Sequence, residues 1–271
     1  MFKLIFFSLF SHLAVGGLLP LLFISLDEIG TMFFRLINLL SAAFLIFALL
    51  AHPFDNSMPS ASYPVFGFSG NLVIGLLIFS IIALLAGTIW LKRLRTSYVW
   101  LAMFSGMAVL LLSAAAYPVL PDLAQPSFAT KALSFASSAF LLGSVMTAMI
   151  TGHWYLVNHR LTIQPLKIAS LLFLAATVLR VLFVLAVMSA NAFAESAAAM
   201  NLLSLSGAGM IFWARVAIGL VGPLIFGIMI YETVKLRSTQ SATGILYAAV
   251  VMVFIGEAFS KFLWYFTGIP V

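Results

Sequence analysis

Eight runs of mainly apolar residues follow one another along the chain, and short polar segments separate them. Each run has about 20 residues or more, the length that an α-helix needs to cross a hydrocarbon layer of about 30 Å. An α-helix also satisfies its own backbone polar groups, as a bilayer requires. The pattern therefore predicts eight membrane-spanning helices, over residues 4–26, 32–51, 70–91, 98–117, 132–157, 168–190, 208–231 and 243–266.

The composition supports the same fold class. Of the 271 residues, 64% are hydrophobic and 7% are charged, whereas a soluble protein has about 25% charged residues. We therefore expect an all-α integral membrane protein in which residues 1–271 form a single polytopic domain. The first run is too long for a signal peptide, so we expect it to be retained. The chain has no cysteine, which excludes disulfides, cysteine-ligated iron–sulfur clusters and covalently attached c-type haem.

The basic residues divide unevenly between the two sides of the predicted bundle. An even number of spans places both termini on one side, where only Lys3 and Lys131 lie near span ends. Because Lys and Arg concentrate on cytoplasmic loops, we predict a protein of the cytoplasmic (inner) membrane with both termini outside. The basic residues on the opposite side are Arg35, Lys92, Arg93, Arg95, Arg160, Lys167, Lys235 and Arg237.

Charged residues also fall inside the spans, at Arg180, Arg215, Glu257 and Lys261. Each costs about 3 kcal/mol to insert, so each calls for a functional explanation and a partner. Glu257 and Lys261 are four residues apart, so they share one helix face and are expected to form an ion pair. Arg215 lies at a similar depth, which predicts one cluster of these three residues in the outer half of the bundle. Such a cluster either serves a ligand or protons, or only holds helices together.

Two histidines lie in the same outer half: His12 in the first span and His52 at the end of the second. Imidazole both donates and accepts hydrogen bonds, as a site for a quinone carbonyl or a quinol hydroxyl requires. A haem b held by both histidines is an alternative, although their depths differ. The two other histidines, His153 and His159, flank aromatic residues that are typical of a membrane interface.

Short motifs spread over the whole chain resemble one family. The last span carries Gly-Glu-x-x-x-Lys-x-x-Trp-Tyr, which ends at Tyr265. This motif, Phe-Trp-Ala-Arg at 212–215, Ala-Val-Gly-Gly at 14–17 and Ala-His-Pro at 51–53 resemble the membrane-anchor subunits of dimethyl sulfoxide reductases, and more broadly the quinol anchors of polysulfide-reductase type. The chain departs from the family at Asn71, where the family has an acidic residue.

The resemblance implies a haem-free anchor with eight spans and both termini outside. It implies electron exchange between membrane menaquinone or ubiquinone and an iron–sulfur partner subunit on the outer face. That partner would serve a catalytic subunit, often a molybdopterin enzyme. No metal ligand is expected in the chain itself.

The expected quinone site lies near the outer face. His52 is expected to bond a quinone oxygen and to accept its proton, with His12 as a second or alternative partner. Arg215 is expected to polarise a quinone carbonyl. Glu257 and Lys261 are expected to form an ion pair that sets the local electric field. Trp264 and Tyr265 are expected to line the mouth of the site.

Three other functions remain open from the residues alone. The chain could be a haem b-binding subunit, a small-molecule or proton-coupled transporter, or a purely structural anchor. Transporters usually show repeats or helices broken at mid-membrane. Here only Pro20 and Pro223 lie well inside predicted spans, which favours the anchor over the transporter.

Overall fold

The computed structural model describes residues 1–52, 70–91, 97–117, 123, 125–158 and 161–271. Within these ranges, eight helices are long and apolar enough to cross a membrane. The predicted fold class and number of spans are therefore confirmed, and the chain is a multi-pass helical membrane protein.

Six of these spans are single helices, and the first and seventh are composite. Two short helices, α2 (Leu26–Ile29) and α9 (Ala197–Leu203), lie between spans. The spans are, in order, α1 with η1 (Phe2–Leu18 and Leu19–Leu22), α3 (Thr31–Leu50), α4 (Gly70–Ile89), α6 (Ser97–Ala115), α7 (Phe128–Val157), α8 (Gln164–Phe193), α10 with η3 and α11 (Ala208–Val216, Ala217–Val221 and Gly222–Lys235), and α12 (Thr239–Thr267).

Several bounds differ from the apolar runs because a proline or a capping residue sets where the helix ends or begins. The first span ends near Leu22, not at residue 26, since Pro20 has no backbone N–H and the chain tightens into a 3₁₀ turn there. The helix α7 begins at Phe128, four residues before the apolar run, because the Ser127 side chain caps it by accepting a hydrogen bond from the Thr130 N–H at 3.2 Å.

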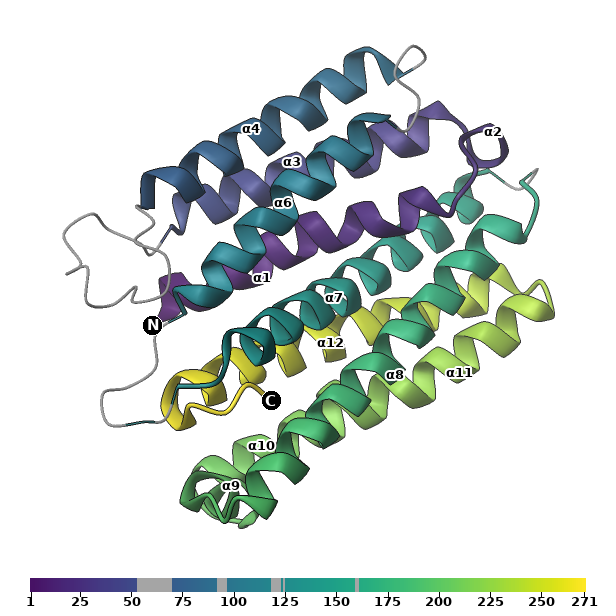
Figure 1. The fold of residues 1–271 in the computed structure, drawn as a ribbon. Helices are drawn as coiled ribbons and strands as arrows, with labels where there is room; N and C mark the ends of the chain where they lie inside the picture. Colours follow the sequence, from purple (N-terminus) through teal and green to yellow (C-terminus); the bar gives the residue numbers. More distant parts are fainter. Residues whose placement is uncertain (53–69, 92–96, 118–122, 124, 159–160) are drawn as a thin grey trace.

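The spans form two groups that meet along α1 and α7 (Figure 1). The first group contains α1, α3, α4 and α6, and the second contains α7, α8, α10–α11 and α12. The helix α7 packs against α1 on one side and against α8 and α12 on the other. It therefore lies at the centre of the molecule, with a neighbour from each group.

Both termini lie at the same end of the bundle (Figure 1), which we call the terminal end. Among the described residues, the opposite end carries Arg35, Lys167, Lys235 and Arg237, and we call it the basic end. The predicted uneven distribution of basic residues is present in the described part of the chain. Lys92, Arg93, Arg95 and Arg160 lie outside the described residues.

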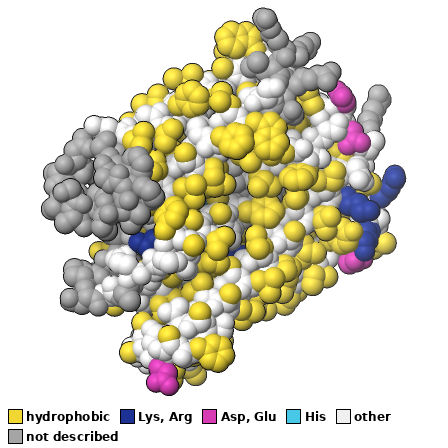
Figure 2. Space-filling view, in the orientation of Figure 1, with side chains coloured by type: hydrophobic (Ala, Val, Ile, Leu, Met, Phe, Trp, Pro, Cys, Tyr) yellow, Lys and Arg dark blue, Asp and Glu magenta, His cyan; other side chains and the backbone are white. Residues whose placement is uncertain are grey.

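The surface between the two ends is apolar. Figure 2 shows hydrophobic side chains across the middle of the molecule and charged side chains near its ends. Ile82, Phe104 and Leu182, each within a span, are 58, 68 and 58% exposed. Large exposed apolar areas are unfavourable in water, so this surface matches a hydrocarbon surrounding.

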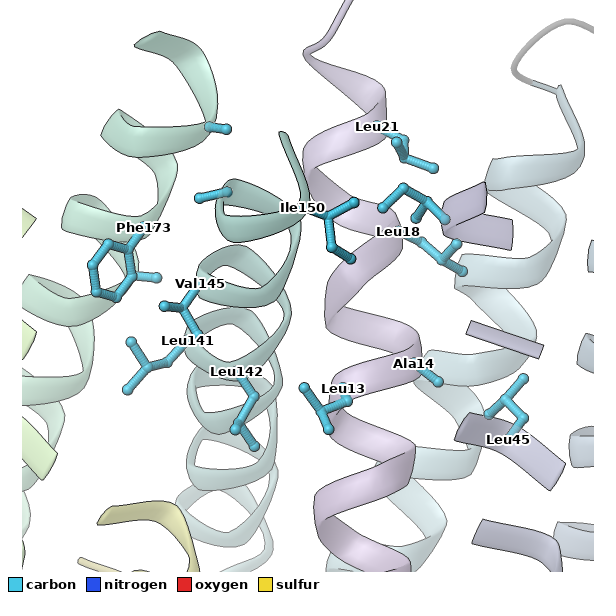
Figure 3. Close-up of a cluster of buried hydrophobic side chains, with 14 of the residues drawn as sticks. Leu13, Ala14, Leu18, Leu21, Leu45, Leu141, Leu142, Val145, Ile150 and Phe173 are labelled. Atoms are coloured by element: carbon cyan, nitrogen blue, oxygen red, sulfur yellow. The ribbon is translucent and has the colours of Figure 1, made fainter. Parts of the chain in front are cut away.

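The core between the two groups is built from leucine, valine and phenylalanine side chains. Figure 3 shows Leu13 of α1 beside Leu142 of α7, and Phe173 of α8 close to Val145 on the other face of α7. These side chains are nearly fully buried. The packing fixes α7 between its neighbours and so fixes the polar residues that α7 carries.

The backbones of α1 and α7 touch at two glycines. A Cβ atom at Gly143 would lie 1.9 Å from the carbonyl carbon of Gly16, and one at Gly16 would lie 1.7 Å from the carbonyl oxygen of Ala139. Small residues at a crossing let membrane helices approach this closely. The crossing holds the part of α1 that carries His12 against α7.

We expect Gly143→Ala to destabilise the protein by at least about 2 kcal/mol, because the added methyl group must push two backbones apart. Gly75→Ala is the matched control, since a Cβ atom there meets nothing within 4 Å. The midpoint of thermal unfolding in detergent compares the two. Equal stability of both variants would contradict a backbone contact at Gly143.

Candidate functional site

Glu257 of α12 lies at the centre of a buried polar cluster, with no exposed surface. Its Oε1 accepts hydrogen bonds from Arg180 Nε at 3.0 Å and from Arg215 Nη2 at 2.8 Å. Its Oε2 accepts from Arg180 Nη2 at 3.1 Å and from Ser138 Oγ at 2.5 Å. One carboxylate therefore joins α7, α8, α10 and α12. We call these residues, with His12 and Lys261, the Glu257 cluster.

Arg180 is the most fully bonded member of the cluster. Besides its two bonds to the carboxylate, Nη1 donates to Ser137 Oγ at 3.1 Å and Nη2 donates to Ser260 Oγ at 3.0 Å. Nη1 also lies 3.3 Å from the main-chain oxygen of Ser134. Every guanidinium nitrogen thus donates to an acceptor, as a buried arginine requires. This pattern is that of a residue that holds helices together.

Arg215 is less completely bonded. Only Nη2 reaches Glu257, and Nε and Nη1 have no hydrogen-bond partner among the described residues. The side chain lies at the last turn of α10, before the π-helical segment η3 and Pro223. Such π segments are often found at functional sites.

A second glycine crossing makes room for the Arg215 guanidinium. A Cβ atom at Gly256 would lie 2.3 Å from the Cα atom of Gly219. A Cβ atom at Gly219 would lie 2.5 Å from Arg215 Nη1. The two glycines therefore bring η3 against α12 and place Arg215 beside the carboxylate.

His12 joins the cluster through a serine of α7. Its Nδ1 lies 2.9 Å from Ser138 Oγ, the same hydroxyl that donates to Glu257. The imidazole packs edge-on against Phe135, with 4.7 Å between ring centres. His12 is fully buried, yet its Nε2 has no hydrogen-bond partner among the described residues. The predicted place of His12 near the charged residues is confirmed.

Lys261 does not pair with Glu257, so this part of the prediction was wrong. The carboxylate already accepts four hydrogen bonds, which use its lone-pair sites. Lys261 Nζ has no hydrogen-bond partner among the described residues. It lies 4.6 Å from the centre of the Phe135 ring and 5.7 Å from that of Trp264. Cation–π attraction to these two rings partly offsets the hydrogen bonds that Nζ lacks.

Trp264 lies inside the protein and does not line a surface mouth, contrary to the prediction. Its ring is fully buried and stacks on Tyr117, with 4.4 Å between ring centres. Tyr117 donates to the main-chain oxygen of Lys261 at 2.8 Å, which fixes this turn of α12. Trp264 Nε1 has no hydrogen-bond partner among the described residues. Tyr265 is half-buried and packs edge-on against Phe266.

His52 follows α3 directly, at the terminal end. Its ring lies edge-on to that of Phe7, with 5.9 Å between centres. Phe7 precedes His12 by five residues, or about 7.5 Å along α1. The two histidines therefore lie in the same half of the bundle, with His52 nearer the terminal end. Among the described residues, the hydrogen bonds from α1 to the Glu257 cluster run through His12.

The cluster lies in the half of the bundle nearer the terminal end, as predicted. Glu257 and His12 are about 10 residues, or about 15 Å, from the ends of α12 and α1 at that face. His153 lies elsewhere: it is exposed, and its Nδ1 is 3.0 Å from Tyr247 Oη. His159 lies outside the described residues.

Sequence reasoning placed Arg180 within a span but did not assign it to the cluster. It also missed Ser134, Ser137 and Ser138 of α7. A signal for these serines was present: they recur at three- and four-residue spacing in an apolar span, so they share one helix face. A polar stripe in a membrane helix indicates a polar partner on a neighbouring helix.

The cluster has more cationic than anionic groups, and several nitrogen atoms in it and in the neighbouring Trp264 have no hydrogen-bond partner among the described residues. Arg180, Arg215 and Lys261 are buried together with a single carboxylate, that of Glu257. A buried polar atom without a partner costs about 1–3 kcal/mol, so a ligand or an ordered water that supplies the missing partner would stabilise the cluster. The atoms are Arg215 Nε, Arg215 Nη1, Lys261 Nζ, Trp264 Nε1 and His12 Nε2.

A quinone is one ligand whose polar groups would suit this donor set. Its carbonyl oxygens accept hydrogen bonds from cationic and indole N–H groups, and a quinol hydroxyl donates to an imidazole nitrogen. In the described part of the chain, no group of three or more His, Cys, Asp or Glu residues could hold a metal ion. No protein-family model matches the chain, and no curated protein matches it significantly. The geometry therefore carries the functional argument.

We expect Glu257→Gln to destabilise the protein by about 3–5 kcal/mol, because it leaves two buried arginines facing a neutral amide. Glu232→Gln is the matched control. It removes an exposed carboxylate that Lys235 contacts at 2.7 Å, and the midpoint of thermal unfolding should not change. The Glu257 pairs would not hold the bundle together if both variants unfolded at the wild-type temperature.

Proposed function

We propose that the chain is the membrane-anchor subunit of a multi-subunit respiratory oxidoreductase. It exchanges electrons between membrane menaquinone or ubiquinone and an iron–sulfur partner subunit at the terminal end. That partner in turn serves a catalytic subunit, of which a molybdopterin enzyme is the expected type. The observation that carries the proposal is the set of buried, unpartnered nitrogen atoms of His12, Lys261 and Trp264 around Phe135, in the half of the bundle nearest that end.

A quinone gives those atoms the partners that they lack. Lys261, Arg215 and Trp264 offer N–H groups to a carbonyl oxygen, and the imidazoles of His12 and His52 can exchange protons with a hydroxyl. The quinone supplies the two-electron chemistry when it is bound, and the protein supplies binding, orientation and proton transfer. Without cysteine, the chain offers no thiolates for an iron–sulfur cluster, so the electrons need a partner subunit.

A purely structural cluster explains less of the geometry. Arg180 and Glu257 satisfy each other and would hold helices together without any ligand. Lys261 Nζ and His12 Nε2, however, are buried and have no hydrogen-bond partner among the described residues. Buried groups of this kind cost stability, so their presence calls for a functional explanation. The unsatisfied atoms therefore favour the quinone site over the inert anchor.

The proposal includes an orientation in the cytoplasmic membrane with the terminal end outside, because the basic end should face the cytoplasm. Alkaline phosphatase, which folds only outside the cytoplasm, tests this orientation. Fused after Ser204, at the terminal end, it should be active. Fused after Arg237, at the basic end, it should be inactive. The reverse pattern would contradict the orientation and place the partner subunits on the cytoplasmic face.

We expect His52→Ala to lower quinol oxidation at least about 100-fold, because the ligand loses a hydrogen-bond partner and a proton acceptor. Assembly with the partner subunits should be intact. His153→Ala is the matched control, since this exposed histidine lies at the basic end. Turnover is measured with decylubiquinol and with a short-chain menaquinol on the purified complex. A His52→Ala complex that turns over at the wild-type rate would contradict the assignment.

A further inference from the structure

The hydrogen bonds around Ser138 fix which nitrogen of His12 carries the proton. Two arginines contact the Glu257 carboxylate at 2.8–3.1 Å and hold it in its ionised form, which only accepts hydrogen bonds. The Ser138 hydroxyl has one proton and lies 2.5 Å from Glu257 Oε2, so it donates there. Toward His12 it can only accept.

His12 must therefore donate through Nδ1, which lies 2.9 Å from Ser138 Oγ. An imidazolium would add positive charge to a buried cluster whose two arginines already outnumber its one carboxylate, so the neutral ring is the stable form. In a neutral imidazole with a proton on Nδ1, Nε2 is a bare acceptor. This is the nitrogen that has no partner among the described residues.

We propose that Glu257 and Ser138 hold His12 in the Nδ1–H tautomer, so that Nε2 is the atom that takes a proton from the hydroxyl of a bound quinol. The inference rests on the proposed function and deepens it. In this proposal His12 is a catalytic residue, whereas the sequence predicted it only as a second or alternative hydrogen-bond partner of the quinone. Ser138 and Glu257 are positioning residues that act through the imidazole.

The proton transfer balances with the groups already named. The O–H bond of one hydroxyl breaks, and an N–H bond forms at His12 Nε2. His52 takes the proton of the second hydroxyl, and both electrons pass to the iron–sulfur partner. The new imidazolium keeps its Nδ1–H···Ser138 bond, and the Glu257 carboxylate beyond that serine stabilises the added charge. When the complex reduces a quinone, His12 returns the proton along the same bond.

Lys261 is placed to assist this transfer. Its Nζ and the His12 ring both pack on Phe135, at 4.6 and 4.7 Å from the ring centre. A hydroxyl oxygen that donates to Nε2 still has lone pairs for an ammonium N–H. As the oxygen loses its proton, the attraction to Lys261 strengthens, which favours the transition state over the ground state.

Nitrogen-15 NMR of the histidine-labelled complex in lipid reads the tautomer directly. The His12 signals are assigned by their loss in His12→Asn and in His12→Gln. We expect Nδ1 to resonate as a protonated nitrogen and Nε2 as an unprotonated one. In Ser138→Ala, Nδ1 loses its acceptor, and the Nε2–H tautomer should gain population. Ser144→Ala is the matched control, because that buried serine of α7 bonds the main-chain oxygen of Leu141 in its own helix.

Measurements of turnover distinguish the catalytic role of His12 from the positioning role of Ser138. Asparagine at position 12 can keep a donor for Ser138 but has no group at the place of Nε2, whereas glutamine can place an amide oxygen there that accepts but does not take a proton. Both variants should lower kcat for decylubiquinol about 100-fold, and only His12→Gln should retain bound quinone. Ser138→Ala should lower kcat on the order of tenfold with little change in KM, and Ser144→Ala should have no effect.

Two results would overturn the inference while leaving the proposed function in place. One is an unprotonated Nδ1 in the wild-type complex. The other is a Ser138→Ala complex with an unchanged histidine spectrum and an unchanged kcat. A wild-type complex that neither binds nor oxidises decylubiquinol or a short-chain menaquinol would overturn the proposed function, and with it the proton-accepting role of His12, even if its spectrum showed the Nδ1–H tautomer.

Discussion

The pairing of one buried carboxylate with two buried arginines is the interaction on which the rest of the structure depends. Glu257 has no exposed surface, and its two oxygens bind residues of three other spans. In a bilayer, apolar helices gain little by choosing one apolar neighbour over another. A buried charged group, in contrast, needs its hydrogen-bond partners beside it, and only one packing of the neighbouring helices provides them. The Glu257 cluster therefore selects how α7, α8, α10 and α12 pack.

Glycine crossings make that arrangement possible. Gly16 with Gly143 and Gly219 with Gly256 let helix backbones touch, and both crossings lie next to charged or titratable members of the cluster. The first holds α1 so that His12 reaches Ser138. The second holds η3 so that Arg215 reaches Glu257. Close packing and electrostatics thus act at the same places, and the unpartnered nitrogen atoms of His12, Lys261 and Trp264 lie around Phe135.

The sequence predicted the span number, the half of the bundle that holds the charges and most members of the cluster, because intramembrane charges and apolar runs are visible in one dimension. It misassigned the partner of Glu257. Lys261 is its neighbour on the same helix, but Arg180 lies 77 residues away and offers a planar, two-pronged donor that fits a carboxylate better. Such a choice depends on which helices are adjacent, which the apolar pattern does not encode. The burial of Trp264 was missed for the same reason.

The central claim is that a quinone binds beside Phe135, between α1, α7 and α12. Photolabelling of the purified complex with an azido-quinone, followed by mass spectrometry of its peptides, tests this claim most directly. We expect covalent label on the segments that hold His12, Phe135 and Lys261–Tyr265, and less label when decylubiquinol competes. Label confined to the basic end near His153 and Tyr247, or label that decylubiquinol does not displace, would contradict it.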